Sequence, residues 1–207
     1  MKLQFSTFLW YVIVTFSVGP ESMQSLDMLT INEEFRNRED LVEMMWKAFS
    51  YFPRGIWEGV NFVGNMSVKC DLKIRSKQDV CGAFIFSHLL RKIKEMRNIL
   101  KTEDLLLAMT HDPVIVVYHR FEVDRFKRTI NIVHDYVSND VGMVSLYETD
   151  EDAVAKVAAH GLGHNQGLTH HAEPIDLMCA GLLHGNPIKI DGFCKGCQLK
   201  LRKRMVV

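Results

Sequence analysis

The chain has 207 residues, and its 25 Lys and Arg residues balance its 25 Asp and Glu residues. A formal net charge of zero provides no bulk electrostatic attraction for nucleic acid, so we do not expect nucleic acid as a partner. Hydrophobic residues make up 47% of the chain, which is enough for a sizeable core. Length and composition therefore predict one domain, or one domain with two subdomains around a cleft.

The first 22 residues have more than one interpretation. Residues 3–18 carry no charge and follow Lys2, as in a signal peptide or a short membrane anchor. The run is at or below the roughly 17–25 residues that a full membrane span needs. Its β-branched and aromatic residues also suit a first strand that is buried on both faces. We favour the strand and a cytoplasmic protein. Secretion or membrane contact follows only if residues 3–18 act as a signal or an anchor.

The next hundred residues are predicted to alternate helices and strands. Apolar residues recur at helical spacing in Glu33–Phe52, and Pro53 ends that helix. Ile56–Asp71 contains glycine breaks between apolar residues, which indicates one or two strands. Val80–Leu100 is predicted to be a second helix with a basic outer face.

Short strands are predicted in the middle of the chain. Leu105–Met109 and Pro113–Tyr118 flank a turn, and Arg128–Tyr136 contains a further apolar alternation. Met143–Tyr147 is predicted to be the last strand before a long helix. That helix begins near Asp152, after a capping residue and with acidic residues in its first turn.

This last helix carries the main functional motif of the sequence. His160 and His164 are four residues apart, so both imidazoles lie on one face of the helix. Gly167 allows the chain to leave the helix, because glycine tolerates the left-handed conformation that ends helices. The turn after this glycine can bring His170 round as a third ligand. Three imidazoles with an open fourth position are typical of a catalytic zinc site, and the spacing matches the metzincin signature.

One position of the motif departs from that signature. The residue after the first histidine is Gly161, where the signature has the glutamate that takes a proton from zinc-bound water. A positioned general base typically contributes about 10²–10⁴-fold to the rate. No residue near the motif is an obvious substitute, because the direction of Glu173 in the following loop is not given by the sequence. No catalytic residue is therefore assigned from the sequence.

Two further features follow the histidines, namely Met178 and the C-x-x-C pair Cys194 and Cys197. A C-x-x-C beside histidines more often binds zinc than joins a disulfide framework. The alternative is a redox pair, which usually has a strand-to-helix setting. Together with the histidine motif, this order resembles the archaemetzincins over roughly residues 143–201. The resemblance implies that Met178 is the methionine of the Met-turn.

The resemblance also implies a second, structural zinc. Four cysteines hold it in archaemetzincins, and the last two correspond to Cys194 and Cys197. His171 and Asp176 stand at the positions of the first two. Because imidazole and carboxylate groups also bind zinc, these four side chains can still close a tetrahedral site, with Cys179 as a rival for the fourth position. We therefore expect zinc as the cofactor, with two ions per chain.

The fold implied by the resemblance is α+β of the metzincin kind, with a mixed twisted sheet and helices. Residues 23–167 would form the N-terminal α/β subdomain with the zinc-binding helix. Residues 168–207 would form a small C-terminal subdomain with the Met-turn and the second zinc site. The cleft between them would bind an extended peptide along the edge strand of the sheet, for which we predict Met143–Tyr147.

The function implied by the resemblance is that of a zinc-dependent metallopeptidase, which hydrolyses peptide bonds with zinc-activated water. Gly161 favours an alternative, namely a catalytically inactive, zinc-bound pseudo-peptidase that acts as a peptide-binding or regulatory module. In either case the partner is a peptide or a protein, and the chain is expected to be a monomer.

Overall fold

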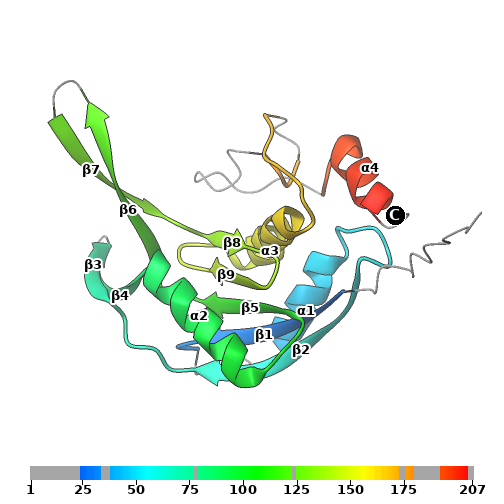
Figure 1. The fold of residues 1–207 in the computed structure, drawn as a ribbon, viewed down its shortest axis with the longest axis horizontal. Coiled ribbons are helices and arrows are strands. Elements are labelled where there is room, and N and C mark those ends of the chain that lie inside the picture. The colour runs from blue at the N-terminus through cyan, green and yellow to red at the C-terminus, as the bar shows by residue number, and fades with distance from the viewer. Residues whose placement is uncertain are drawn as a thin grey trace, which may run out of the picture.

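A computed structural model describes residues 24–33, 38–76, 79–122, 125–172, 176–179 and 192–204 (Figure 1). The predictions for residues 1–22 and for Glu173 lie outside these residues. The described elements are β1 (Gln24–Ile31), α1 (Arg38–Phe49), β2 (Trp57–Met66), β3 (Leu72–Ser76), β4 (Asp79–Ile85), α2 (Phe86–Leu100), β5 (Leu105–Thr110), β6 (Val114–Glu122), β7 (Arg125–Ile132), β8 (Asp135–Val137), β9 (Val141–Ser145), α3 (Glu151–Asn165) and α4 (Lys195–Arg204).

The centre of the fold is a five-stranded sheet in the order β2-β1-β5-β9-β8. The first four strands are parallel, and β8 joins the edge antiparallel to β9. Every residue of β5 is buried, because helices cover both faces of the sheet. Leu107 packs into the core with α1 and α3, while its neighbour Leu106 packs into the core with α2 on the opposite face.

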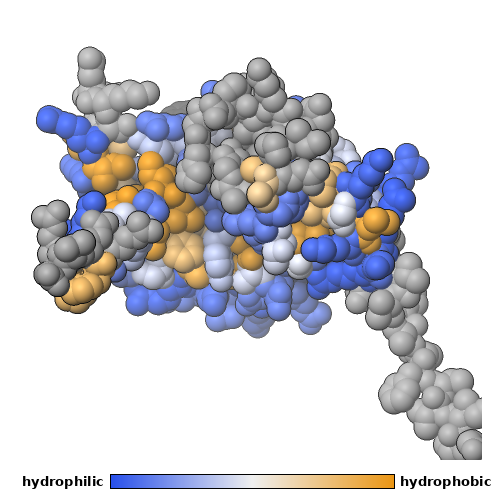
Figure 2. Space-filling model, turned by 90° about the horizontal axis from the view of Figure 1, so that it is seen from above, coloured by the Kyte–Doolittle hydropathy of each residue, from blue (hydrophilic) through white to orange (hydrophobic). Residues whose placement is uncertain are grey.

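A second sheet has the order β3-β4-β6-β7 and ends in the long β6–β7 hairpin. The hairpin projects from the body of the molecule, at the upper left of Figure 1. Phe121 and Phe126 face each other across it at 5.2 Å between ring centroids, and both are largely exposed. Figure 2 shows hydrophobic surface gathered at this end of the molecule. Among the described helices, none combines the length and the apolar character that crossing a membrane requires.

Several predicted elements differ from the observed ones. The helix predicted over Val80–Leu100 begins only at Phe86, because β4 pairs with β3 and β6 instead of continuing the helix. The prediction that Met143–Tyr147 is the edge strand was wrong. Its residues belong largely to β9, which is fully buried and pairs with β5 on one side and β8 on the other. The outermost strand on that side is β8.

Candidate metal centres

The helix α3 brings two of the three motif histidines together. Its small residues let it pack closely, and His160 is buried while His164 is half-buried at its end. Gly167 follows with a φ of +77°, and the amide of Leu168 donates to the carbonyl of Gly163 at 2.9 Å. The helix therefore ends just before Gly167, as the sequence predicted, and the chain turns back toward α3.

The turn places His170 beside the two helical histidines. The Nε2 atoms of His160 and His164 are 3.2 Å apart, and each lies 3.0 Å from the Nε2 atom of His170. Tetrahedral zinc with Zn–N bonds of about 2.0–2.1 Å would place its nitrogen ligands roughly 3.3 Å apart. The three side chains thus have the convergence that one tetrahedral ion requires.

Backbone carbonyls hold two of these rings in orientation. The Nδ1 atom of His160 lies 2.5 Å from the carbonyl of Leu177, and Nδ1 of His164 lies 3.0 Å from the carbonyl of Leu168. Each Nδ1 therefore carries the proton, and the Nε2 lone pairs of both rings face the third histidine. Burial, and next the neighbouring His160, lowers the pKa of both His164 and His170. Neutral imidazoles whose lone pairs converge are suited to a metal cation and repel one another without a proton or cation between them.

One acidic side chain that sequence reasoning missed lies next to this cluster. Asp135 on β8 places its Oδ2 atom 3.8 Å from Nε2 of His160. Burial raises the pKa of Asp135 to about 7, although His164 acts in the opposite direction. Only the pairing of β8 with β9 brings Asp135 here. No motif marks it, because its distance from His160 along the chain follows no local spacing.

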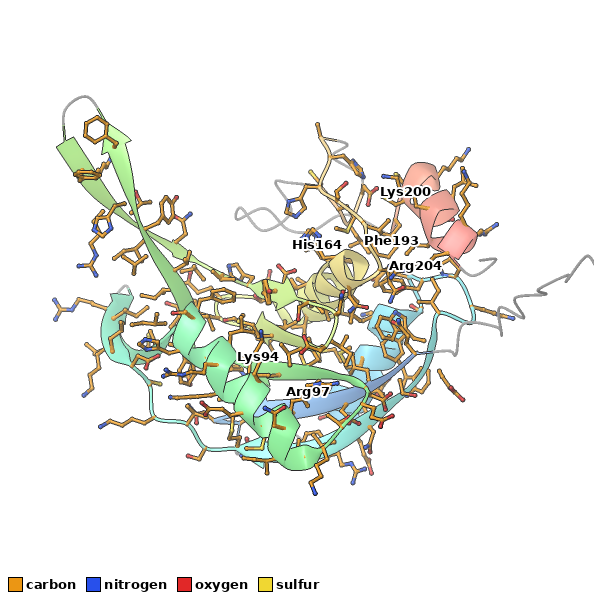
Figure 3. The ribbon with its side chains drawn as sticks, viewed as in Figure 1. Lys94, Arg97, His164, Phe193, Lys200 and Arg204 are labelled. Atoms are coloured by element: carbon orange, nitrogen blue, oxygen red, sulfur yellow. The ribbon has the colours of Figure 1, made fainter. Side chains whose placement is uncertain are left out.

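An open pocket of about 900 Å³ joins these groups. Its lining includes the three motif histidines, residues 130–137 and Cys179. Figure 3 shows His164 on α3, with Phe193 between α3 and α4. The pocket therefore brings the edge strand β8 and the three histidines together.

A second cluster contains His171, Asp176, Cys194 and Cys197. One ligand atom from each of them lies within 4.8 Å of the others. Nε2 of His171 is 2.6 Å from Oδ2 of Asp176 and 3.4 Å from Sγ of Cys197. Cys179, the rival candidate, is not part of this group and lines the histidine pocket instead.

The electrostatics of this second cluster centre on Asp176, which is fully buried. Burial alone would raise the pKa of Asp176, but hydrogen bonds from Cys194 and from the amide of Met178 lower it overall. Burial, and then the hydrogen bond to Asp176, raises the pKa of Cys197 to about 12. Without a metal, this thiol is therefore protonated at neutral pH. A cation at the cluster would have to displace that proton.

Met178 contacts elements of both clusters, namely His171 of the second cluster and the helix α3 of the first. It is fully buried, and its backbone carbonyl accepts a hydrogen bond from the amide of His171 at 3.1 Å. Its side chain lies against α3 at Gly163, where an added Cβ atom would be 2.7 Å from the Met178 sulfur. The methionine therefore packs against the histidine-bearing helix α3, and its role in a Met-turn stays a prediction.

We expect Gly163→Ala to destabilise the fold. The new Cβ would meet the Met178 sulfur and, at 3.2 Å, the Phe193 ring. Overpacking of this kind costs about 1–3 kcal/mol, and the better helix propensity of alanine offsets roughly 1 kcal/mol. Urea unfolding should therefore show a net loss of about 1 kcal/mol. Gly59→Ala is the control, because no atom lies within 4 Å of its added Cβ. A loss of equal size in both variants would contradict the packing argument.

Comparison with solved structures identifies the fold. A crystal structure of an archaemetzincin from Methanopyrus kandleri matches with a TM-score of 0.61 and 17% identity, over 92% of this chain and 99% of that chain. A zinc-dependent peptidase from Methanocorpusculum labreanum matches with a TM-score of 0.54 and 16% identity, over 85% of this chain and 99% of that chain. No family model and no curated protein matches the sequence. The mixed sheets and helices of this chain therefore form the archaemetzincin-like α+β fold that the motif order predicted.

Proposed function

We propose that the chain is a zinc-dependent metallopeptidase in which His160, His164 and His170 hold the ion. The observation that carries this proposal is the convergence of their three Nε2 atoms, 3.0–3.2 Å apart, at an open pocket. Three protein ligands leave a fourth position for water, as in catalytic zinc sites. The zinc-dependent peptidase with the same fold supports the choice of metal.

The chemistry divides between the metal and the chain. Zinc, when bound, lowers the pKa of its water to about 7 and polarises the substrate carbonyl. The carbonyls of Leu177 and Leu168 fix the rings of His160 and His164 in the tautomer that presents Nε2. The edge strand β8 lines the same pocket. An extended peptide or protein segment would pair with β8 through main-chain hydrogen bonds, which replaces the earlier assignment of this role to Met143–Tyr147.

We further propose a second zinc at the cluster of His171, Asp176, Cys194 and Cys197. All four positions come from the protein, which is typical of a structural site. Cys197 and Leu201 belong to the same core as α1 and α3, so this ion would fasten the C-terminal helix to the body of the fold.

The alternative function is a zinc-bound pseudo-peptidase that binds peptides without hydrolysing them. Gly161 is the observation that favours it, because this position supplies no carboxylate. The pocket and the three histidines would be the same for both functions. The two functions therefore differ only in whether a bound peptide is hydrolysed.

Removal of zinc tests the proposed function. We expect the zinc-loaded protein to hydrolyse a mixed peptide library, to lose turnover after chelation, and to recover it when zinc is restored but not when magnesium is added. Mass spectrometry of the products gives the cleavage sites. Turnover that persists after complete zinc removal would contradict the proposal. Peptide binding without any cleavage would instead support the pseudo-peptidase.

A further inference from the structure

The space next to Gly161 is already occupied by β8. A Cβ atom at this position would lie 3.1 Å from Oδ2 of Asp135 and 2.9 Å from Cγ2 of Val137. A glutamate would have to begin its side chain inside that space. The glycine is therefore matched to its surroundings, because it leaves room for a carboxylate that comes from the neighbouring strand.

That carboxylate is largely buried, and its polar neighbour within the described ranges is His160. The side chain of Asp135 is 6% exposed, and its contact with a charged or polar group is the 3.8 Å approach to His160. Among the described residues it accepts no hydrogen bond. Burying a carboxylate in this way is costly, so folds rarely retain one where it serves stability alone. Asp27 shows the contrast, since it is buried in the same sheet but accepts hydrogen bonds from Asn61 and Thr102.

Asp135 lies beside the histidine centre without belonging to it. The group whose ligand atoms lie within 4.8 Å of one another contains His160, His164 and His170, and Asp135 is not a member. Its Oδ2 atom is nevertheless close to Nε2 of His160, and Asp135 lines the same pocket. A carboxylate at this position is too remote to close the site as a fourth ligand. It is close enough to accept a hydrogen bond from a water molecule there.

We propose that Asp135 replaces the absent motif glutamate as the carboxylate that holds and deprotonates the attacking water. This inference rests on the proposed peptidase function. One O–H bond of the water breaks, its proton passes to Oδ2 of Asp135, and the oxygen forms a bond with the peptide carbonyl carbon. When the C–N bond breaks, the amine nitrogen receives that proton and Asp135 is ionised again. One water is consumed, and one carboxyl terminus and one amino terminus are formed.

The first test compares Asp135→Asn with Asp27→Asn in the zinc-loaded full chain. We expect Asp135→Asn to lower kcat by about 10²–10⁴-fold, the usual contribution of a general base, with KM and zinc content unchanged. Its Tm should stay equal or rise, because a neutral amide replaces a buried charge that accepts no hydrogen bond from the described residues. Asp27→Asn should have the opposite effects, namely a lower Tm because its hydrogen bonds are disturbed, and an unchanged kcat.

The second test asks whether Asp135 and a glutamate compete for the same space. Gly161→Glu alone should lower Tm and give no gain in kcat, because its side chain meets Asp135 and Val137. On an Asp135→Ala background the same substitution should lower Tm by less and should restore turnover that Asp135→Ala has removed. Such non-additivity is the expected sign of two side chains in contact.

The outcomes separate this inference from the function on which it rests. Zinc-dependent cleavage that survives Asp135→Asn would overturn the role of Asp135 and leave the peptidase standing. Loss of zinc in Asp135→Asn would show a ligand in place of a base, which also overturns it. Cleavage only by the Asp135→Ala, Gly161→Glu double variant would mean that the fold supports catalysis when a glutamate is supplied, but that the natural chain has no general base. That outcome would overturn the role of Asp135. No cleavage by any zinc-loaded variant would remove both proposals.

Discussion

Replacing His164 by alanine should remove zinc from the histidine centre and reduce peptide hydrolysis to background. The Nε2 atom of His164 lies 3.2 Å from that of His160 and 3.0 Å from that of His170, so the substitution deletes one of three converging ligands. Loss of an outer partner of a ligand already costs 10–100-fold in metal affinity or activity, and loss of a ligand should cost more than about 100-fold. Zinc titration with a competing chromophoric chelator measures the affinity, and peptide cleavage measures kcat/KM.

His88→Ala is the matched control for this experiment. His88 lies on α2, which packs on the opposite face of the sheet, and its ring contacts Asp71 at the surface. We expect the zinc affinity and turnover of the His88→Ala variant to equal those of the unsubstituted protein. If His164→Ala kept zinc at this centre with undiminished affinity, the three-histidine site would be wrong, whatever the activity.

The histidine arrangement could be predicted because it depends on local geometry. Helical spacing fixes His160 relative to His164, and the left-handed Gly167 returns the chain so that His170 meets both. These relations involve few residues and no long-range pairing. The same locality explains why α3 itself was predicted with nearly its observed bounds.

Relations between distant segments could not be predicted in the same way. The alternating pattern around Arg128–Tyr136 indicated strand, but not that β8 would pair with β9 and form the sheet edge. Asp135 was missed for the same reason, because its position beside His160 depends on that pairing. The strand β1 was missed altogether, and its apolar residues gave a weaker signal than the longer apolar run before it.

The second cluster could be predicted in part from the sequence. His171, Asp176, Cys194 and Cys197 were chosen by resemblance to a motif order, and the structure places their side chains together. Their ligation of zinc stays a prediction. Spacing alone left Cys179 as a rival to Asp176, and only the fold separates the two, because Asp176 is fully buried among the cysteines whereas Cys179 lies at the histidine pocket.

Replacing Cys197 by serine should lower the zinc content from two ions to one and loosen α4. Structural zinc sites in zinc-finger peptides have apparent binding free energies of about 10–16 kcal/mol at pH 7, so loss of this ion should lower Tm and the protection of α4 amides from hydrogen exchange. The loss of hydrogen-exchange protection should be confined to the C-terminal part of the chain. The rest of the fold should keep its protection, because Phe193 and Leu201 still pack into the core. The histidine centre should retain its zinc, since none of its ligands changes.

The pH dependence of this second ion follows from the thiol. Because the pKa of Cys197 is about 12 in the metal-free fold, zinc must displace its proton, so affinity at this site should rise with pH through the neutral range. Calorimetry in buffers of different ionisation enthalpy would detect the released proton. Cys179→Ser serves as the control and should retain both ions. If it lost the second zinc while Asp176→Asn kept it, Cys179 would be the fourth ligand, and the pocket would have to rearrange so that its thiol joins the cysteine pair.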